Sequence, residues 1–299
     1  MPYQYGTQGA PAGGGGAPGL PARTGVRGEI LFALPGTYDY VIPDGWTSIC
    51  AVAGGPGGCG FATDSSTRSD ISSGAGGALA YTNNIPVSPG QTIRIVVSRG
   101  GTAAVPGVAS SVTVNDVVVC SAGAGENGAL NATAAGGQVI VGDGGGPGGN
   151  GAFIGSTSAQ LAATGGGAGG YSGKGGNGVA GIATSTTNGN PGVGGAGGSG
   201  SVQATGNTFS RSIGSGGVGP FGEGPSGLGG GIGGSGGENG DSQNGTYYIG
   251  SPGKFGAGGN ATTYSVGTGR FAITNGASGF VRLVSGADRA FPSTDVGPT

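Results

Sequence analysis

The spacing of apolar residues changes along the chain, and the change divides it into two parts. Between Glu29 and Gly125, short stretches of alternating apolar and polar residues are separated by turn residues such as Pro35-Gly36. Such stretches, bounded by glycine and proline, are typical of β-strands. We expect strands at 29–33, 37–42, 47–52, 78–82, 92–97, 112–114 and 117–120, and a last one at 279–284. No part of the sequence has a sustained helical period.

The order of these strands predicts how they pair. Asn115-Asp116, between the strands at 112–114 and 117–120, is the sequence of a two-residue hairpin turn. Short strands separated by regular turns favour a small antiparallel β-sandwich. The strand at 279–284 is expected to return to the first sheet of this sandwich.

From Gly142 to Gly259, glycine recurs with a period of three. The runs are 142–151, 167–176, 189–198, 224–236 and 250–259. Three residues per turn is the period of the polyproline II helix, which has no internal hydrogen bonds. Glycine at each third position leaves one edge of such a helix open to another backbone. The pattern predicts a bundle of polyproline/polyglycine II helices, essentially without α-helix.

Two other interpretations of the glycine runs remain. Composition alone also fits a disordered Gly/Ser linker, but the runs are phased and of similar length. Collagen is disfavoured because long inserts interrupt the period and the chain has only 17 prolines.

Composition then divides the chain into four units. Residues 1–27 form a Gly/Pro-rich arm with little to bury, in which Tyr3 and Tyr5 are possible anchors to a larger particle. Residues 28–125 form the sandwich, and 126–278 form the glycine-rich bundle with loop inserts. Residues 279–299 form the returning strand and a tail.

Charge and cysteine content exclude several classes of partner. Of the 299 residues, 8% are charged and the net charge is −2, which gives no basic surface for nucleic acid or anionic membrane. No apolar stretch reaches the length of a membrane span, and the first residues do not fit a signal peptide.

The odd number of cysteines (Cys50, Cys59 and Cys120) argues against a disulfide framework. We expect them to be small buried residues in a protein made in a reducing cytoplasm.

Candidate catalytic patterns are weak. The chain contains no histidine, which removes the commonest general base and metal ligand. Gly233-Gly234-Ser235-Gly236-Gly237 fits the nucleophile-elbow pattern but lies inside the glycine period, so we interpret it as coincidence. Glu238 and Asp241, beside Asn239 and Asn244, have the oxygen ligands that calcium prefers. The default interpretation there is a solvated loop. We therefore expect no enzymatic activity, no cofactor and no metal.

Four stretches carry a resemblance to a known family. They are LPGTYDYVIPDGWTSI at 34–49, GGALAYTNNIPVSPG at 76–90, GGYSG at 169–173 and GASGFVRL at 276–283. In this order they resemble the glycine-rich domain of bacteriophage tail-fibre and tail-tip proteins, over roughly residues 29 to 286. The later tracts resemble, more loosely, phage adhesins built as layered polyglycine helices with receptor-contacting loops at one end.

The resemblance implies a non-enzymatic virion structural protein, a tail-fibre or tip component that presents loops to a host receptor or glycan. The cysteine content and the lack of a leader pattern fit assembly in the host cytoplasm. The composition of the arm, which is not part of the family pattern, predicts contacts with other virion proteins, and we expect a homo-oligomer, most simply a trimer. Neither nucleic acid binding nor membrane insertion is expected. A capsid-attached fibre or decoration protein is one alternative, and an ice-binding protein with a flat polyglycine face is another.

Aromatic residues in the inserts are the candidate receptor contacts. Rigid amphipathic rings are favoured binding anchors. The best candidates are the pair Tyr247-Tyr248, beside Asp241 and Asn244, followed by Phe209 and Phe221. Phe153, Tyr171, Phe255 and Tyr264 lie in or beside other inserts. The alternative is that these rings cap the ends of the bundle and exclude water from it.

Overall fold

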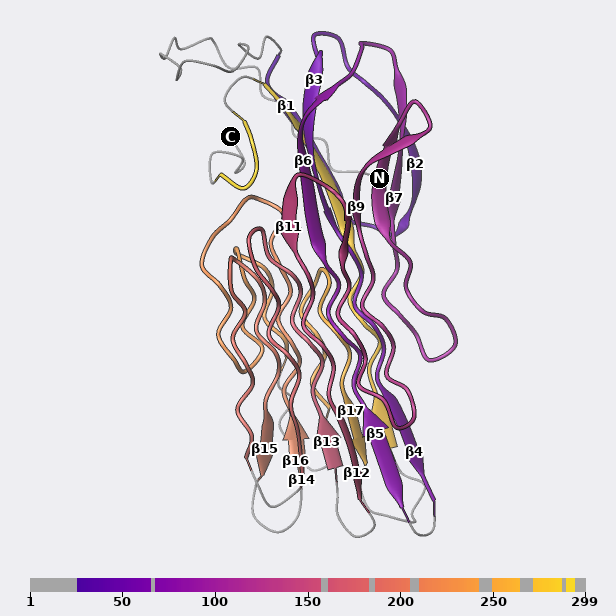
Figure 1. Cartoon of the computed structure of the whole chain (residues 1–299), viewed down its shortest axis with the longest axis vertical. Helices are drawn as coiled ribbons and strands as arrows, with labels where there is room; N and C mark the ends of the chain where they lie inside the picture. Colours follow the sequence, from indigo (N-terminus) through magenta and orange to yellow (C-terminus); the bar gives the residue numbers. More distant parts are fainter. Residues whose placement is uncertain are drawn as a thin grey trace.

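A computed structural model of the chain describes residues 26–65, 68–156, 161–182, 186–204, 210–241, 249–263, 271–286 and 289–293. All regular secondary structure in these residues is β, as the alternating pattern predicts, and none of it is helical. No helix within these ranges has the length and apolarity to cross a membrane. The molecule is elongated, with two sheets at one end, glycine-rich arms in the middle and short strands at the other end (Figure 1).

Two five-stranded antiparallel sheets form the first end. The first sheet has the order β1 (Gly28–Phe32), β19 (Phe280–Ser285), β3 (Ser48–Gly54), β6 (Leu79–Pro86) and β11 (Gly144–Gly146). The second has the order β10 (Val139–Val141), β9 (Val117–Ala122), β8 (Ser110–Val114), β7 (Thr92–Val97) and β2 (Gly36–Val41).

The strands expected between 29 and 120 are therefore confirmed, with small shifts at their ends. The strand expected at 279–284 is β19, and it returns to the first sheet between β1 and β3. Asn115 and Asp116 have φ angles of 49° and 61° and join β8 to β9. Both residues thus adopt the left-handed conformation that a two-residue hairpin of this type requires.

The two sheets share one hydrophobic core. Its residues come from both sheets, among them Ile49 and Leu283 of the first and Ile93, Ile95 and Val112 of the second. Along β7, buried residues alternate with exposed ones, because one face of the second sheet packs on the core and the other meets solvent. β19 is buried along its whole length, so the first sheet is covered on both faces.

The opposite end consists of short strands. One sheet contains β12 (Phe153–Ser156), β5 (Ser69–Ser72) and β4 (Phe61–Asp64). A second contains β14 (Ala180–Ile182), β13 (Leu161–Ala163), β17 (Ala261–Thr263) and β18 (Phe271–Ile273). A two-stranded sheet pairs β15 (Val202–Ala204) with β16 (Ser210–Ser212).

Between these ends the chain runs as glycine-rich arms that bond to one another through their backbones. The five consecutive N–H groups of residues 74–78 donate to the carbonyl oxygens of Gly259, Glu126, Gly149, Gly256 and Gly123, in that order. Residues 74 and 77 thus bond to one neighbouring arm, 75 and 78 to a second, and 76 to a third. A β-strand bonds to two neighbours in one plane, whereas each arm here bonds in three directions with a repeat of three residues.

Close approach of the arms requires glycine at two positions of every three. A Cβ added to Gly74 would lie 2.0 Å from the carbonyl oxygen of Gly58, and one on Gly76 would lie 1.9 Å from that of Gly167. Ala75, between them, keeps its methyl group and is fully buried. The sequence pattern predicts one glycine-lined edge per arm. In the structure two edges of this arm meet other backbones, so both edges need glycine.

The predicted runs are not single uninterrupted rods. Gly194 and Gly195, in the run at 189–198, have φ angles of 57° and 74° and reverse the chain. Turns also divide the runs at 224–236 and 250–259, and Gly144–Gly146 in the first run is strand β11. Glycine favours both close backbone contact and left-handed turns, so its spacing does not distinguish an arm from a reversal.

The sandwich also draws on more of the chain than residues 28–125. β10 and β11 lie beyond that range and add one edge strand to each sheet. Cys50, Cys59 and Cys120 are buried and form no disulfide with one another, as expected for small buried residues.

The arm geometry predicts a large effect of one methyl group. In Gly76→Ala, the new Cβ overlaps the Gly167 carbonyl oxygen, and the Gly76 N–H bond to Gly149, 2.8 Å long, is strained or lost. We expect a loss of about 3 kcal/mol or more in unfolding free energy, since overpacking a close-packed interior is costly. The control Ala75→Gly keeps every backbone bond and should cost about 1 kcal/mol. Equal melting temperatures of the two variants would contradict the assignment of close backbone packing.

The β8–β9 hairpin predicts a stabilising substitution. Asp116 has a φ of 61°, and glycine adopts this conformation without the steric cost that other residues incur. Asp116→Gly should raise the unfolding free energy by about 0.5 kcal/mol. Relief of the left-handed backbone strain stabilises the folded state, and the larger conformational entropy that glycine loses on folding offsets part of this gain. Asp116→Ala should lower it, and chemical denaturation of both variants measures the difference.

Candidate functional site

The end of the molecule opposite the sandwich, here called the distal end, is the candidate site. It is formed by the short strands β4, β5 and β12 to β18, which come from widely separated parts of the chain (Figure 1). The glycine-rich arms give way there to short strands whose residues carry side chains, such as Leu161-Ala162-Ala163 in β13 and Ala261-Thr262-Thr263 in β17. Many chain reversals therefore meet at one surface.

A small hydrophobic core fixes the strands of the distal end. Ile71 of β5 packs with Leu161, Ala163 and Ala261 of the four-stranded sheet, and all four are fully buried. This core ties the three-stranded and four-stranded sheets together, so the strand ends have a defined spacing.

Polar side chains pair with one another where β4 turns into β5. The Nε atom of Arg68 lies 2.8 and 2.9 Å from the two carboxylate oxygens of Asp70. This hydrogen bond, with the charge of Asp70, raises the pKa of the half-exposed Arg68 guanidinium. Ser69 donates a hydrogen bond to the carboxylate of Asp64 on the neighbouring strand. Ser69 and Asp70 are buried, so these contacts hold the turn between β4 and β5 in place.

Two of the predicted receptor contacts lie within the described residues. Asp241 is exposed; its N–H donates to the Ser251 carbonyl (2.8 Å), and its own carbonyl accepts from the Gly214 N–H (2.9 Å). Gly214 follows β16 by two residues, so Asp241 lies toward the distal strands. Phe209, Asn244, Tyr247 and Tyr248 fall outside the described residues. The flanking positions are nonetheless neighbours, because Ser212 forms a parallel bridge with Ile249.

Phe221 lies elsewhere, beside the sandwich. Its ring is 4.9 Å from the guanidinium carbon of Arg282 in β19, a cation–π contact. The carbonyl oxygen of the preceding Pro220 accepts a hydrogen bond from the same guanidinium. The structure therefore does not bring Phe221 together with Asp241, and its ring packs where the bundle meets the first sheet.

Two other aromatic residues of the inserts also cover this junction. Tyr171 is fully buried, and its hydroxyl donates to the Gly219 carbonyl (3.1 Å) and accepts from the Gly222 N–H (3.0 Å). Phe255 packs edge-on against Phe280 of β19, with ring centroids 5.0 Å apart. For these residues the capping interpretation holds, since they close the bundle where it meets the sheet.

The same junction contains a charge cluster that the sequence analysis missed. Glu29 of β1 pairs with both Arg282 and Arg289, whose side chains are each only 1% exposed. Burial lowers the pKa of Arg282, and the charge of Glu29 opposes that shift. The available signal was an arginine inside the apolar stretch Phe280-Val281-Arg282-Leu283-Val284. Such a residue needs a partner when the strand is buried on both faces.

This cluster predicts a strong effect of removing one charge. Glu29→Gln removes the charge that pairs with the buried Arg282 and Arg289 guanidiniums and should cost about 3–5 kcal/mol of unfolding free energy. The control Asp39→Asn removes a pair with Arg94 that is exposed and 3.3 Å long, and should cost less than about 1 kcal/mol. Thermal unfolding of both variants tests this; similar small shifts would show that Glu29 does not compensate the arginines.

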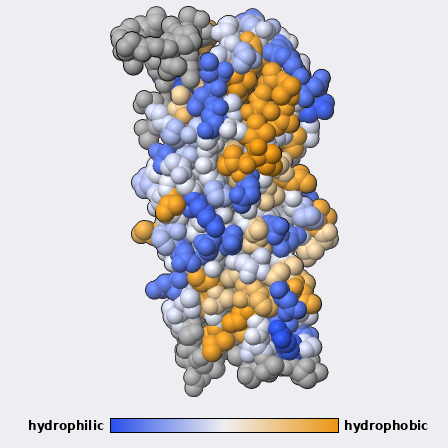
Figure 2. Space-filling view, in the orientation of Figure 1, coloured by the Kyte–Doolittle hydropathy of each residue, from blue (hydrophilic) through white to orange (hydrophobic). Residues whose placement is uncertain are grey.

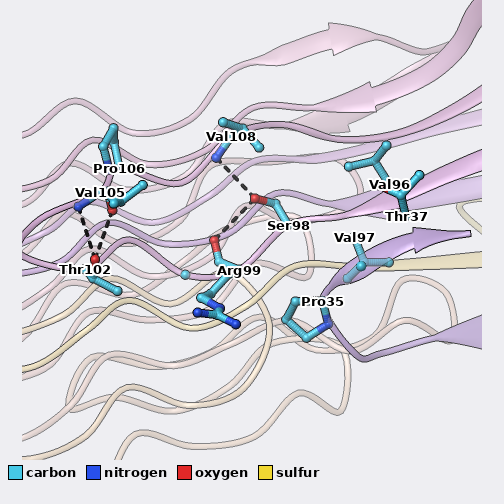
Figure 3. A pocket seen from close by; sticks show the side chains of 12 residues that line it. Pro35, Thr37, Val96, Val97, Ser98, Arg99, Thr102, Val105, Pro106 and Val108 are labelled. Carbon is cyan, nitrogen blue, oxygen red and sulfur yellow. Dashed lines mark hydrogen bonds between the residues drawn. The ribbon is translucent and has the colours of Figure 1, made fainter. Parts of the chain in front are cut away.

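Two surface pockets lie near the sandwich end. The first, of about 480 Å³, is lined by Pro35, Val97, Arg99 and the loop from Thr102 to Val108. Figure 3 shows how hydroxyl groups hold this loop: Ser98 accepts from the Val108 N–H (3.1 Å), and Thr102 bonds to the backbone of Val105. The second, of about 610 Å³, lies between Leu34-Pro35 and the bundle residues Pro252 to Phe255. Their linings are mainly apolar and backbone groups.

The residues singled out for catalysis or metal binding have structural partners. The Ser235 hydroxyl donates to the Gly195 carbonyl (2.8 Å) and accepts from the Gly224 N–H (3.1 Å). Glu238 forms an exposed ion pair with Lys254 at 3.0 Å, and the side-chain oxygen of Asn239 accepts from the Gly233 N–H. Across the described ranges, no three histidine, cysteine or acidic residues gather as a metal site would require.

In sequence, the chain matches no known protein-family model and no curated protein.

Proposed function

We propose that this chain is a non-enzymatic virion structural protein, a tail-fibre or tail-tip component that presents loops for attachment to a host surface. The observation that carries the proposal is the set of arms, bonded in three directions, which bring many chain reversals to one distal end. The resemblance of residues 29–286 to the glycine-rich domain of phage tail proteins supports it.

For the arms we further infer polyglycine II geometry. Gly166 and Gly169 donate to Gly74 and Gly77 of one arm, while Gly167 donates to Gly176 of another. A repeat of three residues in the direction of the bonds is that of a three-residue turn, as in polyproline II. A β-strand, with its repeat of two, would return to the same neighbour after two residues.

A rigid support favours binding by loops. Residues 205–209 join β15 to β16, and residues 264–270 join β17 to β18. Residues 242–248 connect Asp241 to the bridge at Ile249. The anchor points of 264–270 belong to the distal core, and those of the other two stretches lie in the β15–β16 pair and at the Ser212–Ile249 bridge. A partner contacting these stretches would therefore not have to order the framework beneath them. Less ordering on binding leaves more of the contact energy as affinity.

The sandwich end is the proposed side of attachment to the particle. The described chain begins at Val26, two residues before β1, so the arm of residues 1–27 leads to this end. Figure 2 shows apolar side chains gathered over the sandwich end on the face in view. Exposed apolar residues of the second sheet include Val41, Val117, Val118 and Ile140. A contiguous apolar surface of this kind favours a protein contact.

The proposal predicts that the two ends can be disabled separately. Tyr247→Ala combined with Tyr248→Ala should reduce binding of the purified protein to host cells by about tenfold or more, as loss of central aromatic anchors does. Incorporation into particles and the melting temperature should stay unchanged. Deleting residues 1–27 should have the opposite effect, with normal cell binding and no incorporation.

Immunogold labelling of virions then locates the protein. Gold at the tail tip or fibres fits the proposal, while gold over the capsid favours the decoration alternative. If the tyrosine variant binds cells normally, the contact surface lies elsewhere. Absence from virions together with thermal hysteresis in ice would replace the proposal with the ice-binding alternative.

A further inference from the structure

Residues Arg289–Ser293, here called the C-terminal strap, lie across the outer face of the first sheet. Asn83 of β6 makes a reciprocal pair of hydrogen bonds with Phe291: its side-chain nitrogen donates to the Phe291 carbonyl, and its oxygen accepts from the Phe291 N–H, both at 2.9 Å. The Arg289 guanidinium donates to the Gly28 carbonyl (3.1 Å) and pairs with Glu29. The strap is thus bound to two strands of the sandwich.

The same five residues also contact the bundle. The Phe291 ring, 3% exposed, stacks on Tyr171 at 5.9 Å and lies 6.0 Å from Tyr81. The Pro292 carbonyl accepts a hydrogen bond of 2.8 Å from the Glu223 N–H. Tyr171 and Glu223 both lie at turns of the bundle where it meets the sandwich. Phe291 therefore joins one cluster that contains residues of sheet, bundle and strap.

The path of the chain shows why the contacts of the strap with both sheet and bundle matter. The part of the bundle between β13 and β17 enters at Leu161 and leaves at Thr263, both at the distal end. Its turns at the sandwich end therefore have no covalent link to the sandwich beside them. Apart from lateral bonds between arms, these turns are held by side-chain packing on the first sheet, by the hydrogen bond from Arg282 to the Pro220 carbonyl and by the strap.

We propose that the C-terminal strap is a latch that fastens the free turns of the bundle, at 171–173 and 220–223, to the first sheet. Opening the latch exposes the junction locally, while the sandwich core and the distal end keep their structure. Release is local because the strap takes no part in either of those cores. This inference does not depend on the proposed function.

A buried thiol beneath the strap reports on the latch. The Cys50 thiol donates to the Arg289 carbonyl at 3.2 Å and is covered when the strap is closed. Cys59 and Cys120 lie outside the junction cluster, and burial raises their pKa to about 11 and about 12. Since the thiolate is the reactive form, these two cysteines should react slowly unless the whole protein unfolds.

The test is site-resolved thiol labelling of the full chain, read by mass spectrometry of peptides. Phe291→Ala removes the stacked ring and should raise the labelling rate of Cys50 by about tenfold or more, as expected for a locally destabilised segment. Cys59 and Cys120 should keep their wild-type rates. The matched control Phe271→Ala removes a ring that is 45% exposed at the distal end and should leave Cys50 protected.

Asn83→Ala provides an independent variant in case Phe291→Ala does not fold. It removes both hydrogen bonds to Phe291 but leaves the strap sequence intact, and should raise Cys50 labelling to a smaller extent. Unchanged labelling of Cys50 in the folded variants overturns the latch. Parallel labelling of all three cysteines also overturns it, because the strap would then be an inseparable part of the global fold.

Discussion

The structure depends on one constraint: buried backbone N–H and carbonyl groups of each arm must find partners in neighbouring arms. Unpaired polar groups inside a protein are costly, and the arms carry few side chains that could satisfy them. Bonding in three directions solves this, as the donors of residues 74–78 demonstrate. It requires backbones so close that a Cβ at Gly74 or Gly76 would overlap a carbonyl oxygen. The 81 glycines of the chain follow largely from this requirement.

Glycine makes the arms expensive to order, so the ends must stabilise the middle. Fixing each backbone costs about 1–2 kcal/mol, whereas a typical hydrogen bond contributes only about 0.5–1.5 kcal/mol net. Burial of apolar side chains supplies the difference, and it is concentrated at the two ends. The sandwich core and the junction cluster hold one end of the arms, and the core around Ile71 and Leu161 holds the other.

The sequence predicts the division into a sandwich and a glycine-rich bundle better than it predicts the turns and strand pairings within them. Strands such as Thr92–Val97 were predictable because one face is buried and the other is solvated, which leaves an alternating pattern. The all-glycine strand Gly144–Gly146 carries no such pattern, and the turn at Gly194 has the same residue type as the arms. Pairing between distant residues such as Gly28 and Ser285 has no local signal. The predicted site residues lie at two different ends for the same reason. The end that an insert reaches depends on the number of chain reversals before it, and glycine spacing does not reveal those reversals. Phe221 therefore lies at the sandwich end, away from Asp241.

Because the arms in the middle bond through their backbones, the two ends of the molecule differ in how much sequence change each can tolerate. An arm makes its bonds through main-chain atoms, so these bonds do not depend on which side chains follow beyond the last distal strand. A longer or altered connection between β15 and β16 changes no bond of Gly198 or Gly216 in the adjoining arms. A change at Glu29 or Arg282, by contrast, affects a buried charge cluster that joins sheet, bundle and strap. The connections beyond the last distal strands are therefore free to vary in sequence, while the junction and the distal core are constrained.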